Sequence, residues 1–129
     1  MKWLVPAMLV LVALIHLPPL LGVFGVARME LAYGVQIADP NLAVLMRHRA
    51  VLFGLVGALM LAAVFLPPLR ASALLISLLS AGSFVLLAWS SAGLNANLGR
   101  VAMVDVAAVL FSLVGLAAWW FERTPAATA

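Results

Sequence analysis

Four apolar stretches, each longer than twenty residues, restrict what this chain can fold into. They cover about residues 4–26, 40–66, 71–92 and 100–121. A helix rises about 1.5 Å per residue, so roughly 20 apolar residues cross a hydrocarbon core about 30 Å thick. Hydrophobic residues make up 67% of the chain and charged residues 9%, whereas soluble domains are about half apolar and a quarter charged. The sequence therefore predicts a single-domain, all-α integral membrane protein, built as a four-helix antiparallel bundle.

The first stretch contains a proline pair that interrupts its helix. Pro18 and Pro19 each lack an N–H, which leaves backbone carbonyls near His16 without their normal partners. We expect a bend there, with His16 bonded to a neighbouring helix. The stretch is longer than the core of a signal peptide, and residues 27–29 lack a small-x-small cleavage site. We therefore expect a retained spanning helix.

The connection between the first two stretches carries clear helix start and stop signals. Residues 28–33 predict a short interfacial helix, which Gly34 would end. Asp39 is a typical N-cap, and Pro40 a typical first helical residue. The second spanning helix is therefore expected to begin at Pro40.

Small residues recur every fourth position in the second stretch. This stripe would allow close approach of another helix, or of a second copy of the chain, and consists of Ala50, Gly54, Ala58 and Ala62. Arg47 shares its face by helical spacing and is predicted to point into the bundle. His48 and Arg49 are each turned by about 100° from the preceding residue, so we expect them to reach toward lipid phosphates.

The fourth stretch contains the one carboxylate that is expected inside the membrane. Asp105 shares a face with Ala108, Ser112 and Gly115, and therefore points inward. In an antiparallel bundle the polar residues of several helices meet near the two connections on one side. The candidate ligand-binding residues are His16, Arg47, His48, Arg49, Asn95, Arg100 and Asp105. Residues 122–129 are expected to form a short polar tail.

The residue types in this cluster favour some functions and disfavour others. An excess of arginines over one carboxylate suits an anionic head group, whereas an ion pair of Asp105 with Arg47 or Arg100 would be structural. The chain has no cysteine, and two histidines are a thin ligand set, so no metal, haem or other cofactor is predicted. The sequence contains no HExxH motif, nucleophile elbow or phosphate loop that would indicate an enzyme. The sequence also has no run of basic residues of the kind that binds nucleic acid.

Short motifs along the whole chain resemble the small bacterial DoxX-like membrane proteins. These motifs are His16-Leu17-Pro18, Tyr33-Gly34-Val35, Asp39-Pro40-Asn41, Arg47-His48-Arg49-Ala50-Val51-Leu52-Phe53-Gly54 and Asp105. The resemblance implies a four-helix inner-membrane bundle with a polar cluster near one face, and no settled activity. A phosphopantetheine adenylyltransferase assignment is not supported, because that enzyme's His-x-Gly-His motif and α/β domain are absent.

Three functions follow as expectations from these observations. The leading one is binding of an anionic or amphipathic small molecule or lipid. The alternatives are a non-catalytic structural or accessory subunit and a proton-coupled small-molecule exporter. Membrane lipids are the expected partners, with a homo-oligomer formed through the small-residue stripe. The single lysine and the arginines near the helix ends leave the orientation in the membrane undecided.

Overall fold

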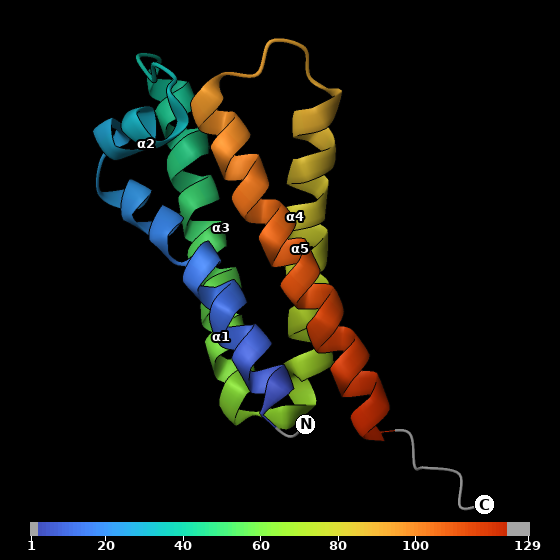
Figure 1. Cartoon of the computed structure of the whole chain (residues 1–129). Helices are drawn as coiled ribbons and strands as arrows, with labels where there is room; N and C mark the ends of the chain where they lie inside the picture. The colour runs from blue at the N-terminus through green and yellow to red at the C-terminus, as the bar shows by residue number, and fades with distance from the viewer. Residues whose placement is uncertain (1–2, 124–129) are drawn as a thin grey trace, which may run out of the picture.

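The computed structural model describes residues 3–123, which are almost entirely helical and contain no β-strand (Figure 1). The order is α1 (Leu4–His16), η1 (Pro18–Phe24), α2 (Val26–Tyr33), α3 (Pro40–Phe65), η2 (Pro67–Leu69), α4 (Arg70–Ser90) and α5 (Ala96–Arg123), where η marks a 3-10 helix. Four segments are long and apolar enough to cross a membrane: Leu4–Phe24, Pro40–Phe65, Pro67–Ser90 and Ala96–Arg123. Together they indicate a multi-pass membrane protein.

The predicted signals around the first connection are confirmed. The carboxylate of Asp39 accepts a hydrogen bond of 2.7 Å from the Asn41 N–H, and α3 begins at Pro40. Gly34 ends α2 with a φ of 65°, in the left-handed region where a side chain is strained. The short helix begins at Val26, two residues before the predicted start.

The last helix is longer at both ends than predicted. It begins at Ala96 rather than at residue 100, because the Asn95 side chain accepts the Leu98 N–H at 2.8 Å and so caps an earlier first turn. It continues to Arg123, so the first two residues of the predicted polar tail are helical. The rest of that tail, residues 124–129, lies outside the described residues.

The core lies where α1 packs against α3, α4 and α5. Its fully buried side chains include Val5, Leu9, Met60 and Leu74. The most extensive contact joins α4 and α5, which lie side by side in Figure 1. A buried hydrogen bond of 3.0 Å between the hydroxyls of Ser112 and Ser77 crosses this contact, as expected where small polar residues join apolar helices.

The proline pair divides the first span into two parts with different neighbours. The α-helix ends at His16, and the 3-10 helix η1 then turns onto α3. There a Cβ added to Gly54 would lie only 2.6 Å from Leu20 Cδ1, so this glycine allows the close approach. Within residues 3–123, η1 contacts α3 and α2 but not α5. Figure 1 shows this segment running away from α5 toward α2.

Only the first half of the predicted small-residue stripe is buried within the chain. The buried face of α3 follows Ala50, Gly54 and Gly57, whereas Ala58 is exposed. A strict four-residue repeat drifts by about 40° per step on a helix with 3.6 residues per turn. Ala50 and Gly54 already pack against η1 of the same chain, so that half of the stripe is not free for a second copy.

Candidate functional site

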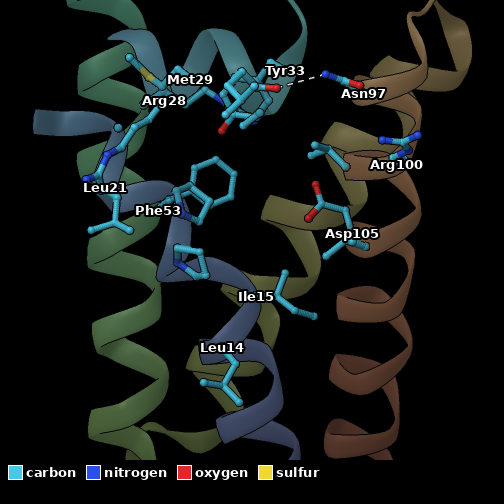
Figure 2. A pocket seen from close by; sticks show the side chains of 18 residues that line it. Leu14, Ile15, Leu21, Arg28, Met29, Tyr33, Phe53, Asn97, Arg100 and Asp105 are labelled. Atoms are coloured by element: carbon cyan, nitrogen blue, oxygen red, sulfur yellow. Dashed lines mark hydrogen bonds between the residues drawn. The ribbon is translucent and has the colours of Figure 1, made fainter. Parts of the chain in front are cut away.

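A cavity of about 560 Å³ lies beside the bend in the first span, between η1 and α2 on one side and α5 on the other (Figure 2). Most of its wall is apolar. The apolar side chains include Leu14, Ile15, Leu21, Met29, Phe53, Val101 and Val104. The polar and charged lining residues are Arg28, Tyr33, Arg49, Asn97, Arg100 and Asp105. The cavity exists because the proline pair directs η1 onto α3 instead of α5.

One end of the cavity opens toward exposed apolar side chains. Leu14 and Val104 line the cavity from facing elements, and both side chains are also exposed. Polar residues gather at the other end, near α2, where Figure 2 shows Arg28, Tyr33, Asn97 and Arg100. The cavity is therefore amphipathic, with most of its polar and charged side chains at one end and mainly apolar side chains along the rest.

Arg49 is the arginine that points into the protein. Its guanidinium carbon lies 5.2 Å from the Tyr33 ring centroid, 4.7 Å from that of Phe53 and 5.4 Å from that of Phe84. These rings come from α2, α3 and α4, and distances below about 6 Å are typical of cation–π contacts. No hydrogen-bond acceptor among residues 3–123 is bonded to this guanidinium. Its N–H donors are therefore available to a ligand.

Arg49 also lines a second, smaller hollow of about 280 Å³ between α3 and α4. Phe53 belongs to the walls of both spaces, and Phe84 to the wall of the smaller one. The three aromatic rings therefore hold the Arg49 guanidinium between the larger cavity and the smaller hollow.

Asp105 faces the larger cavity, as its predicted inward direction requires. The residue is 4% exposed, and its Oδ2 has no hydrogen-bond partner. Figure 2 shows the carboxyl directed from α5 into the cavity. Arg49 acts on it electrostatically, but within the described part of the chain no arginine forms a salt bridge with it. The structural ion pair with Arg47 or Arg100 is therefore not formed.

His16 is buried beside the cavity but does not line it. Its Nδ1 donates to the Val12 carbonyl of its own helix at 3.0 Å, so the predicted bond to a neighbouring helix is wrong. Its ring centroid lies 5.6 Å from that of Phe53. The buried Nε2 has no partner among the described residues. His16 thus supports Phe53 and does not contact the cavity directly.

Arg47 and His48 both lie outside the cavity. Arg47 lies beside the end of η1 with its side chain exposed, so the prediction that it points into the bundle is wrong. Its Nε donates to the Val23 carbonyl at 2.9 Å, which ties the end of η1 to α3. His48 is exposed. The predicted interior role of Arg47 therefore belongs to Arg49.

The asparagines of the second connection hold α2 in place. Asn95 donates to the carbonyls of Tyr33 and Gly34 at 3.0 and 3.2 Å, so it supports the site without lining it. Asn97 donates to the Leu31 carbonyl at 3.1 Å and also lines the cavity, as does the exposed Arg100. These bonds fix α2 against the start of α5.

Four residues that line the two hollows are not among the ligand-binding residues predicted from the sequence: Arg28, Tyr33, Phe53 and Phe84. The rings of Tyr33, Phe53 and Phe84 surround Arg49. Only the packing of three separate helices brings these rings to one guanidinium. No spacing signal within a single helix could have found them.

Comparisons with protein-family models, with curated proteins and with solved structures find no match to this chain.

Proposed function

We propose that this protein is a DoxX-like, four-helix antiparallel bundle of the bacterial inner membrane that binds an anionic amphipathic small molecule or lipid. The anionic head would contact Arg49, Arg28 and Arg100, and the apolar wall would hold the hydrocarbon chain. The observation that carries the proposal is the Arg49 guanidinium, which three rings position at the cavity wall without a hydrogen-bond acceptor.

The charges around the cavity support an anionic ligand. Three arginines and one carboxylate line it, so its net charge is positive. Guanidinium groups bind carboxylates and phosphates with paired, charge-assisted hydrogen bonds. A purely structural cluster would pair its own groups, whereas here Arg49 lacks an acceptor and Asp105 Oδ2 lacks a donor. These unpaired hydrogen-bonding groups favour ligand binding over a structural-subunit role.

The size and shape of the cavity support an amphipathic ligand. Its volume of about 560 Å³ falls within the range of about 300–1,000 Å³ that is typical of small-molecule sites. The apolar wall continues to the exposed side chains of Leu14 and Val104. A ligand already dissolved in the bilayer would enter there with its chain in contact with hydrocarbon throughout.

A binding experiment with a matched pair of arginine variants tests this function. Native mass spectrometry in a nonionic detergent would measure binding of dodecanoate and of dodecanol, which has the same chain length but no charge. We expect discrete dodecanoate binding to wild type, weakened at least about tenfold in Arg49→Met, because hydrogen bonds to charged groups contribute about 1.5–3 kcal/mol each. Arg47→Met is the control, since this exposed arginine does not line the cavity.

Two results would contradict the proposal. One is equal binding of dodecanoate and dodecanol, because the site would then not recognise charge. The other is equal loss in Arg49→Met and Arg47→Met, because the cavity would then not be the site.

Proton-coupled export is a second candidate, favoured by the buried Asp105 whose Oδ2 has no partner. Ionisable groups in spanning helices commonly carry protons in transporters. In proteoliposomes with an imposed proton gradient, Asp105→Asn alone would abolish gradient-driven dodecanoate flux while dodecanoate binding remains. Absence of such flux in wild type would exclude this candidate.

A further inference from the structure

We infer that the amphiphile selected by this cavity carries a hydroxyl group on its chain, and that this hydroxyl donates to the carboxyl group of Asp105. The inference rests on the proposed function and names the chemical class of its ligand. It starts from the one buried carboxylate oxygen in the described chain that has no hydrogen-bond partner.

An unpaired carboxylate oxygen at this depth requires a donor. Asp105 is 4% exposed, and buried polar groups in folded proteins are nearly always hydrogen-bonded. Leaving an acceptor unsatisfied costs about 1–3 kcal/mol, and more for a charged group. Figure 2 shows the carboxyl directed into the cavity, opposite Phe53 and above Ile15. Asp105 lines the cavity, so a ligand there lies against its carboxyl group.

The position of Asp105 places the donor on the ligand's chain and not on its head. Asp105 lies five residues after Arg100 on α5, which corresponds to about 7.5 Å along the helix axis. Arg28 and Arg100 belong to the polar end of the cavity, whereas Ile15 and Leu14 lie farther toward the apolar end (Figure 2). An amphiphile whose anion contacts the arginines would pass Asp105 with its hydrocarbon portion.

The surrounding charges favour a hydroxyl over an ammonium as that donor. Arg49 acts on Asp105 electrostatically, and Arg28 and Arg100 line the same space. A second positive group on the ligand would be attracted by one carboxylate and repelled by three guanidiniums. A hydroxyl supplies the hydrogen bond without this repulsion.

A hydroxyl scan of one amphiphile tests the inference. Dodecanoate would be compared with its monohydroxylated isomers, in which the hydroxyl moves one carbon at a time along the chain. Native mass spectrometry of wild type should show one isomer, or two adjacent ones, binding at least about tenfold more tightly than dodecanoate. Asp105→Leu should lose this preference while still binding dodecanoate, which also reports that the variant is folded.

Two further variants keep the test decisive. Ser112→Ala is the control, because Ser112 is buried on the same helix but lies outside the cavity, and it should retain the preference. Asp105→Asn keeps the shape of the side chain and should reduce the preference if the leucine variant does not fold. The inference is overturned if no isomer surpasses dodecanoate in wild type, or if the preference survives in both Asp105 variants. Failure of dodecanoate itself to bind would instead overturn the proposed function.

Discussion

The contact of η1 with α3 creates one wall of the cavity, and substitution of a single glycine tests it. In Gly54→Ala the new Cβ would lie 2.6 Å from Leu20 Cδ1, with Cδ2 at 3.0 Å and Cγ at 3.1 Å. The first distance is about 1 Å shorter than the 3.5–4.0 Å of ordinary carbon contact. Three side-chain carbons of Leu20 are too close, so this buried contact must rearrange to accept the methyl group.

Overpacking of this kind costs about 1–3 kcal/mol. Gly82→Ala is the matched control, because its Cβ would meet only Val109 Cγ2, at 4.0 Å. Both glycines lie inside spanning helices, so the intrinsic effect of alanine cancels in the comparison. We therefore expect Gly54→Ala to be less stable than Gly82→Ala by about 1–3 kcal/mol. Reversible unfolding in mixed micelles measures the difference. Equal stability of the two variants would refute the packing of η1 on α3.

Two further predictions concern the hydrogen bonds that hold the helices around the site. Asn95→Ala removes the α5 cap and both bonds to the end of α2. Amide hydrogen exchange in α2 should therefore accelerate, and the free energy of unfolding should fall by about 0.5–2 kcal/mol. Unchanged exchange in α2 would contradict this. Ser77→Ala and Ser112→Ala each break the one bond between them and should cost about 1 kcal/mol, whereas the double variant should cost less than their sum in a double-mutant cycle. Strict additivity would show that the two hydroxyls do not interact.

Local signals predicted the helices well because they act within a few residues. Asp39 and Pro40 start α3 through bonds inside one turn, and Gly34 ends α2 through its own φ. The inward direction of Asp105 follows from the small residues on its face, and the structure confirms its burial. These features depend on the backbone and on helical periodicity, which the sequence displays directly.

The arginines of α3 show why the site itself was harder to predict. Arg47 and Arg49 lie two residues apart, and helical periodicity predicts that Arg47, not Arg49, points into the bundle. However, η1 ends beside Arg47, which is left exposed, while rings from α2 and α4 enclose Arg49 together with Phe53. The length of η1 and the position of α2 depend on the proline bend and on the bonds of Asn95. Such contacts between distant segments have no signature in one sequence.

We propose that Arg49 anchors a bound anionic amphiphile. The most direct test is native mass spectrometry of the protein extracted from its own membranes in mild detergent, without added ligand. Wild type, Arg49→Met and Arg47→Met would be compared, together with their thermal stability as a check of folding. We expect one discrete adduct mass in wild type and in Arg47→Met that is absent from folded Arg49→Met. The same adduct on all three proteins, or none on any of them, would contradict it.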